Sequence, residues 1–174
     1  YTTLFRSDQQ AAELAQEVRG LLKDAIQHTR RLSRVLVPPV LQSEGLVGAL
    51  GELAVYAESV YGCASSFQHD PAMKPIDPSV STQLYRIAQE AVTNACKHAD
   101  LRTLQIDLNQ EGSEVALKVC DDGQGIADPG GNGLGLRIMR YRASMIGGHL
   151  EIYSGETGGT TVVCRVPVPD ERSS

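Results

Sequence analysis

Two adjacent prolines, Pro38 and Pro39, divide the chain into parts with different hydrophobic patterns. Proline fixes its own φ angle, lacks the N–H that a helix interior needs and restricts the preceding residue, so a helix that reaches this point has to end there. Before the prolines, apolar residues recur at helical spacing; after them, helical and alternating patterns follow one another. The sequence therefore predicts one long helix over residues 8–36 and a separate mixed domain.

The predicted helix over residues 8–36 carries apolar residues spaced alternately four and three positions apart. The apolar members are Leu14, Val18, Leu21, Ala25, Leu32 and Val35, and His28 occupies the remaining position of the seam. This heptad spacing indicates a seam that packs on another helix, and apolar neighbours such as Leu22 and Ile26 widen it into a stripe typical of a bundle. Because one helix cannot bury such a stripe alone, we expect a homodimer through this helix, pairing with helices upstream of this chain, or both.

The two ends of the chain stand outside these patterns. Residues 1–7, YTTLFRS, precede the helical pattern, and one back-translation of them spells the end of a short-read sequencing adapter. We interpret them as a cloning or assembly scar, with a frayed natural terminus as the alternative. Residues 169–174 are expected to be a tail.

Composition excludes several classes of function. The 174 residues are 41% hydrophobic and 21% charged, which is typical of a globular protein with one core and an appendage. A net charge of −5, with basic residues spread along the chain, argues against direct nucleic-acid binding. The four cysteines are widely spaced and form no C-x-x-C pair, so we expect neither a zinc site nor disulfides, which fits a reducing cytoplasm. No apolar run reaches the roughly 18 residues of a membrane span, so any membrane attachment of the parent protein is expected upstream of this chain.

The part after the prolines alternates between helical and strand patterns. Helices are predicted from Ser43, as N-cap, to about Tyr61, from Ser79 or Ser81 to Ala99, and from about Leu134 to Ile146. Strands are predicted over CASSFQ, around LQIDL and VALKV on either side of a hairpin, and over HLEIYS and TTVVCRVPV. This order predicts an α+β fold, a two-layer α/β sandwich with one face of the sheet covered by helices.

The helix that ends near Ala99 brings unlike polar groups together. Glu90, Asn94 and Lys97 lie within two turns on one side of it. Asparagine is a poor helix former, so its presence in mid-helix indicates that the side chain has a function, although most such polar strips are solvated surfaces. Mg²⁺ prefers oxygen ligands and takes few of them from protein, so Asn94 is a candidate ligand and Lys97 a candidate charge for phosphate oxygens.

Two glycine-spaced hexapeptides follow, DDGQGI at 121–126 and GNGLGL at 131–136. Asp121 can accept a hydrogen bond from an exocyclic amine, and the glycines after it permit a tight turn and close approach of a ligand. The second hexapeptide leads into a helix, whose first N–H groups suit a phosphate. Neither loop is specific alone, because glycine-rich loops are usually turns and the spacing matches neither a Walker loop nor a dinucleotide fingerprint.

The order of QEAVTNACKHA, DDGQGI, GNGLGL and GGTTV resembles the asparagine box and the three glycine boxes of the GHKL (Bergerat-fold) ATPases. This family is shared by sensor histidine kinases, Hsp90, MutL and type II topoisomerases. Within it, LYRIAQEAVTNACKHA, GLGLRIMRYRASMIGG and RRLSRVLVPPVLQSEGLVGAL are similar to bacterial sensor kinases that pair with helix-turn-helix response regulators. The resemblance implies an ATP-binding catalytic domain over residues 44–168, preceded by one long helix of a dimerisation bundle.

The resemblance also implies a role for each matched residue. Glu90 corresponds to the polarising base, Asn94 to the Mg²⁺ ligand, and Lys97 and His98 to residues that approach the phosphates. The residues expected to hold the adenine of ATP, or the turn around it, are Asp121, Gly123 and Gly125. The residues expected to frame the triphosphate are Gly131, Gly133, Leu134, Gly135 and Thr160.

One departure from the family pattern concerns the phosphoacceptor histidine. In the family it lies on the first helix of a two-helix hairpin and precedes an acidic residue, whereas residues 8–37 resemble the second helix, and His28 precedes Thr29. We therefore expect an ATP-dependent histidine kinase that does not phosphorylate itself alone. The alternatives are a degenerate nucleotide-sensing module, disfavoured by the intact boxes, and an anti-sigma-factor-like serine kinase, which would not need the heptad seam.

Overall fold

The computed structural model describes residues 38–98, 101–126, 133–155 and 158–168, within a compact unit that begins at Pro38. The predicted helix over residues 8–37, the suspected scar at 1–7 and the expected tail at 169–174 lie outside the described residues. Of the helices that the structure describes, none combines the length and the apolarity that crossing a membrane requires.

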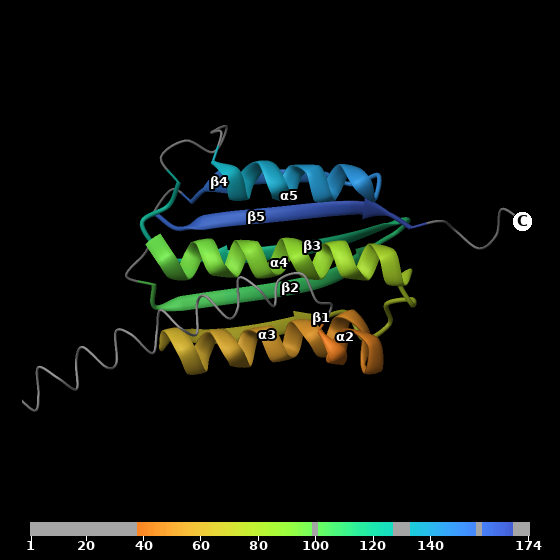
Figure 1. The fold of residues 1–174 in the computed structure, drawn as a ribbon, viewed down its shortest axis with the longest axis horizontal. Coiled ribbons are helices and arrows are strands. Elements are labelled where there is room, and N and C mark those ends of the chain that lie inside the picture. The colour runs from red at the N-terminus through yellow and green to blue at the C-terminus, as the bar shows by residue number, and fades with distance from the viewer. Residues whose placement is uncertain (1–37, 99–100, 127–132, 156–157, 169–174) are drawn as a thin grey trace, which may run out of the picture. The chain divides into compact units, whose positions relative to one another are not determined.

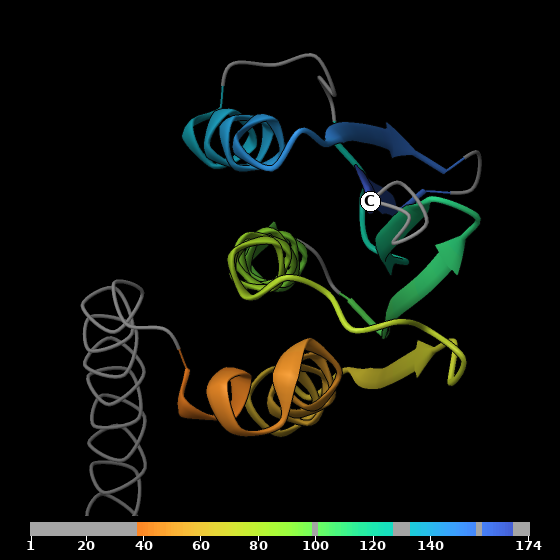
Figure 2. The ribbon, with the colours of Figure 1, turned by 90° about the vertical axis from the view of Figure 1, so that its right-hand side faces the viewer.

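Helices and strands follow the predicted order. The helices are α2 (Pro39–Ser43), α3 (Gly45–Tyr61), α4 (Pro78–His98) and α5 (Leu134–Met145). The strands are β1 (Ala64–His69), β2 (Thr103–Glu111), β3 (Glu114–Asp121), β4 (His149–Ser154) and β5 (Thr160–Pro167). They form one sheet in the order β1-β2-β3-β5-β4, in which β1 runs parallel to β2 and the other neighbours are antiparallel. Helices α3, α4 and α5 lie on the same face of this sheet (Figures 1 and 2), which confirms the predicted two-layer sandwich.

The core lies between the three helices and the sheet. In β2 and β3 the alternating apolar residues face the helices, and Ile106 pairs with Val119 and Leu108 with Leu117. Across the interface, Leu84 and Ile87 of α4 are fully buried. Each such aliphatic side chain stabilises the fold by about 1.5–3 kcal/mol when buried, whereas exposed ion pairs contribute about 0–1 kcal/mol. The fold therefore depends on this apolar layer.

The segment after the prolines differs in one detail from the prediction. A short helix that was not predicted, α2, precedes the expected one, and the expected helix, α3, begins with Gly45 at a φ of +71° after Glu44. Ser43 does not cap α3, because its hydroxyl instead donates to the carbonyl oxygen of Pro39 at 3.3 Å. The end of α3 agrees with the prediction: Gly62 adopts the left-handed conformation (φ +72°) and its N–H bonds Glu58.

The N-terminus of α4 is capped by a residue that the sequence prediction missed. Asp77 Oδ1 accepts the backbone N–H of Ser79 at 2.7 Å and that of Val80 at 3.4 Å, and it also accepts the Ser79 hydroxyl. These hydrogen bonds, first of all the one from the Ser79 side chain, lower the pKa of Asp77. The prediction named Ser79 or Ser81 as the start, and an aspartate directly before a proline at N1 was the signal that identifies the cap.

We predict that Asp77→Ala lowers the thermal unfolding midpoint at neutral pH, because two N–H groups of the first turn lose their acceptor. Since the folded state lowers the pKa of Asp77, the stabilisation is present above the ordinary carboxyl pKa and is lost as pH falls through the lowered value. Melting curves followed by circular dichroism check both points. Asp77→Asn, which keeps an acceptor, is the control and should melt close to the parent; equal midpoints for parent and Asp77→Ala would contradict the capping role.

Candidate functional site

A cavity of about 580 Å³ lies where the last turns of α4, the end of β3, the start of α5 and the start of β5 come together. Its volume is within the range of small-molecule sites. The described residues that line it are Ala91, Asn94, Ala95, Val119, Asp121, Gln124, Gly125, Ile126, Gly133, Leu134, Gly135, Leu136, Met139, Thr160 and Val162. The cavity therefore combines segments that are up to about 70 residues apart in the chain.

Most of the residues predicted from the sequence meet at this cavity. Seven of them line it, namely Asn94, Asp121, Gly125, Gly133, Leu134, Gly135 and Thr160. Gly123 lies in the turn beside them and contributes a backbone N–H to Asp121. Glu90 lies next to Gly135, and Lys97 is exposed near the end of α4. The side chain of His98 and all of Gly131 lie outside the described residues.

The Asp121 carboxylate has one oxygen held by the protein. Asp121 Oδ1 accepts the backbone N–H of Gly123 at 2.9 Å and that of Thr160 at 3.2 Å. Within the described part of the chain, no donor bonds the other oxygen, Oδ2. Because a carboxylate has about four acceptor positions, the cavity is left with an oriented hydrogen-bond acceptor.

Glycines let the backbone turn tightly around this carboxylate. Gly125 and Gly159 both have a φ of +79°, and the N–H of Gly159 bonds the carbonyl of Gly123 at 2.6 Å. A Cβ on Gly159 would collide with the carbonyl oxygen of Asp121, and one on Gly125 would lie 3.1 Å from the carbonyl oxygen of Gly159. The turn that contains Gly123 and Gly125 and the turn that contains Gly159 therefore have to approach each other closely. The sequence motifs do not predict this close approach.

The first turn of α5 packs directly on α4. A Cβ on Gly135 would lie 2.5 Å from Glu90 Oε1 and 3.2 Å from the side-chain nitrogen of Asn94. The N-cap residue Gly133 has no side chain that could bond the first N–H groups of this 12-residue helix, and among the described residues no other acceptor bonds them, so they can face an anion. A carboxylate, an amide and a helix N-terminus therefore adjoin one end of the cavity.

Apart from Gln124, the rest of the described cavity wall is apolar, and it was not predicted as part of the site. Its buried members are Ala91, Ala95, Val119, Met139 and Val162. The helical periodicity of α4 puts Ala91 and Ala95 on its buried face, but no sequence signal shows that they border a cavity, because that depends on how α4, α5 and the sheet pack. Small alanines on α4 leave room for a flat apolar group beside Asp121.

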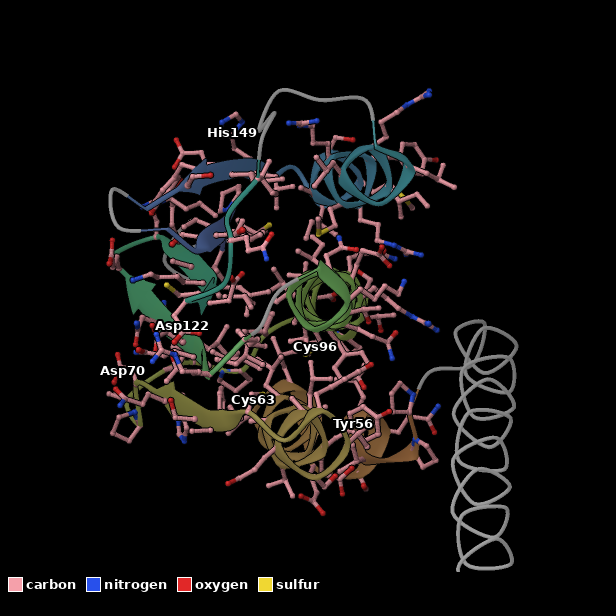
Figure 3. The ribbon with its side chains drawn as sticks, turned by 90° about the vertical axis from the view of Figure 1, so that its left-hand side faces the viewer. Tyr56, Cys63, Asp70, Cys96, Asp122 and His149 are labelled. Atoms are coloured by element: carbon pink, nitrogen blue, oxygen red, sulfur yellow. The ribbon has the colours of Figure 1, made fainter. Side chains whose placement is uncertain are left out.

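No cysteine is among the described residues that line the cavity. Cys63 is buried, Cys96 is partly buried on α4, and Figure 3 labels both. Burial raises the pKa of Cys96 and that of Cys164 to about 12, so both thiols remain protonated at neutral pH. Nucleophilic chemistry by these thiols is therefore disfavoured.

The fold and the cavity define a class of nucleotide-binding ATPase domain, and comparisons with known proteins agree. Residues 79–170 match the family described as histidine kinase-, DNA gyrase B-, and HSP90-like ATPase. This match spans more than half of the chain. The chain belongs to this family, and its domain is an ATP-binding catalytic domain of the kind found in sensor histidine kinases.

Individual relatives support the same assignment. The oxygen sensor histidine kinase NreB of Staphylococcus carnosus is 31% identical over 159 residues, which cover 90% of this chain and 46% of that protein. The histidine kinase domain of a blue-light activated histidine kinase from Erythrobacter litoralis is 26% identical with a TM-score of 0.57, covering 71% of this chain and 61% of that one. The ATP binding domain of PrrB from Mycobacterium tuberculosis, at 22% identity, has the same fold, with a TM-score of 0.58 over 72% of this chain and 95% of that one.

We predict that Gly159→Ala destabilises the protein more than Gly147→Ala. Both glycines have positive φ, a conformation that costs other residues about 1–2 kcal/mol. A Cβ at Gly147 meets nothing within 4 Å, whereas one at Gly159 collides with the backbone of Asp121. Chemical denaturation of both variants measures the difference, and equal losses would show that the close approach at Gly159 is readily relieved.

Proposed function

We propose that this chain is the catalytic part of a bacterial sensor histidine kinase, which transfers the γ-phosphate of ATP to a histidine outside this chain for relay to a response regulator. The chain spans about half the length of the curated relative it matches, so the activity of the whole protein is inferred. The observation that carries the proposal is that Asn94, Asp121 and Gly135 line one and the same cavity.

The adenine of ATP is assigned to the Asp121 end of the cavity. The exocyclic amine of adenine is a hydrogen-bond donor, and Asp121 Oδ2 is an acceptor directed by the two backbone bonds to Oδ1. The buried Ala91, Val119 and Met139 offer the apolar surface that an aromatic ring requires. Gly123 and Gly125 shape the turn that borders the ring.

The triphosphate is assigned to the other end, where α4 meets α5. Asn94 is the proposed Mg²⁺ ligand, and the described residues contain no group of three His, Cys, Asp or Glu side chains that would hold a metal by themselves. This donor set fits a cation whose other ligands are phosphate oxygens and water, and such a cation neutralises charge during the transfer. Gly131, Gly133, Leu134, Gly135 and Thr160 are proposed to frame the phosphates, with Lys97 and His98 at their margin.

Glu90 is the proposed catalytic base. Its carboxylate lies next to Gly135 in the first turn of α5, beside the proposed phosphate site. There it would polarise the imidazole of an acceptor histidine, whose ring nitrogen forms a bond to the γ-phosphorus while the bond to the bridging oxygen breaks and ADP leaves with the electron pair. The protein contributes mainly position and charge compensation to this step.

The proposed assembly follows the family resemblance. Residues 8–37 are proposed as the second helix of a dimerisation hairpin, residues 44–168 as the catalytic domain, and the chain as part of a homodimer. The proposed partner is a response regulator with a helix-turn-helix output domain, and no direct contact with nucleic acid is proposed. The catalytic part is proposed to act in the cytoplasm, with any membrane anchor in the region upstream.

We predict that the chain binds Mg-ATP and that Asp121→Asn weakens this binding. An amide at this position can present its N–H₂ group where the adenine amine needs an acceptor, and losing a charge-assisted hydrogen bond costs about 1.5–3 kcal/mol, or roughly tenfold or more in affinity. Titration calorimetry measures the constants, with Asp70→Asn, which lies beyond the end of β1, as the control. Equal affinity for parent and Asp121→Asn would remove Asp121 from the adenine site.

A second prediction concerns phosphoryl transfer. With labelled ATP and Mg²⁺, the chain should not acquire stable phosphohistidine but should phosphorylate a supplied dimerisation hairpin of its full-length parent, slowly because the effective concentration of a linked acceptor is lost. Acid-labile label distinguishes phosphohistidine from phosphoserine. Label on this chain that disappears in His28→Gln would contradict the first half. ATP binding without transfer to the hairpin would favour a nucleotide-sensing module, and acid-stable label on a protein serine would favour a serine kinase.

A further inference from the structure

The turn at 121–126 is held from outside the cavity by the exposed carboxylate of Asp122. Asp122 Oδ1 accepts the backbone N–H of Arg102 at 2.9 Å and that of Thr103 at 2.8 Å. The backbone N–H of Asp122 in turn donates to the carbonyl of Thr103 at 3.4 Å. Figure 3 labels Asp122 at the end of the sheet where β2 begins and β3 ends. The Asp122 side chain thus attaches the beginning of the turn to the start of the neighbouring strand, β2.

This contact connects the turn to two strands. The carbonyl of Arg102, whose N–H bonds Asp122, accepts the N–H of Ala64 at 2.8 Å, and Ala64 is the first residue of β1. The hydrogen bonds from Thr103 and Arg102 hold the pKa of Asp122 below its ordinary value, so the carboxylate is charged across the neutral range. Acceptors of this charged kind form the stronger hydrogen bonds of proteins.

The other end of the turn is held by Ser154, the last residue of β4. Its hydroxyl accepts the backbone N–H of Ile126 at 3.0 Å and donates to the carbonyl of the same residue at 3.0 Å. Ile126 lines the cavity, whereas neither Ser154 nor Asp122 does. The Ser154 hydroxyl also lies 3.2 Å from the position of a Cβ on Gly125, so it borders the tightest part of the turn.

We propose that Asp122 and Ser154 are positioning residues for nucleotide binding, which fix the two ends of the segment 121–126 so that Asp121 and Ile126 face the adenine. This proposal rests on the proposed role of Asp121 in holding the adenine. A hydrogen bond weakens steeply when its geometry is displaced, so a turn released at either end loses the orientation of the Asp121 acceptor without any change in the residues that touch the ligand.

The test compares Asp122→Ala, Ser154→Ala and Asp122→Asn in the full chain, with titrations of ATP, ADP and adenosine at a temperature where each variant is folded. Both alanine variants are expected to lose about tenfold in affinity, by the same factor for all three ligands, because the adenine end is affected. Asp122→Asn keeps an acceptor oxygen and is expected to stay within about twofold of the parent. Asp77→Ala is the matched control. Asp77 is also exposed and also accepts two backbone N–H groups, but far from the cavity, so this variant should bind all three ligands like the parent.

The outcomes separate this inference from the proposed function. No binding by the parent, or no effect of Asp121→Asn, would refute the adenine site itself. Parental affinity in both alanine variants, together with lower unfolding midpoints, would overturn the positioning role and leave a purely structural one. A loss that grows with the number of phosphates would also overturn it.

A second measurement keeps the proposal testable should an alanine variant fail to fold. Amide hydrogen exchange of Arg102, Thr103 and Ile126 is followed in the folded parent with and without ATP. Because a ligand stabilises the conformation it binds, ATP is expected to slow exchange at these three N–H groups at least severalfold. Unchanged exchange would overturn the proposal, because the hydrogen bonds made by Asp122 and Ser154 would then not respond to ATP binding.

Discussion

The site depends on how the Asp121 carboxylate is held. One of its oxygens joins the N–H of Gly123, in its own turn, to the N–H of Thr160, at the start of β5. This pairing continues the contact between β3 and β5 beyond their last ladder pair, Cys120 with Thr161. It works only because Gly159 has no side chain where the carbonyl of Asp121 lies. The oriented acceptor in the cavity therefore depends on a hydrogen bond between the ends of β3 and β5.

The second condition is the one-sided packing of the helices. Because α3, α4 and α5 cover the same face of the sheet, α4 has a neighbour on each side and the apolar sheet beneath it. Its buried residues anchor it, and its last turns meet the first turn of α5 at Gly135, beside Glu90 and Asn94. The same helix thus supplies apolar lining to one part of the cavity and polar groups to the other, which is the division that a nucleotide requires.

The family is one of nucleotide-binding ATPases, and its fold does not specify the group that receives the phosphate. A shared fold hosts different chemistries, and the family of this chain includes proteins as different as histidine kinases and DNA gyrase B. Under the proposed mechanism, the chemistry is selected by the element that brings an acceptor to the proposed base, Glu90. In our proposal that element is the helix predicted over residues 8–37, with residues 44–168 binding the nucleotide.

The sequence by itself determined the order of elements, the one-sided sandwich and most of the polar site, since these follow from periodicity, turn residues and ordered motifs read along the chain. It made Asn94 a candidate because asparagine is unusual in mid-helix, and it made Asp121 and the glycines candidates because their motifs follow one another in the order of a known family. Only the tertiary structure decided that Met139 and Val162 line the cavity, that Gly159 has to be a glycine, and that Asp122 and Ser154 hold the turn. These contacts join residues that are distant in sequence and have ordinary local patterns, so packing alone brings them together.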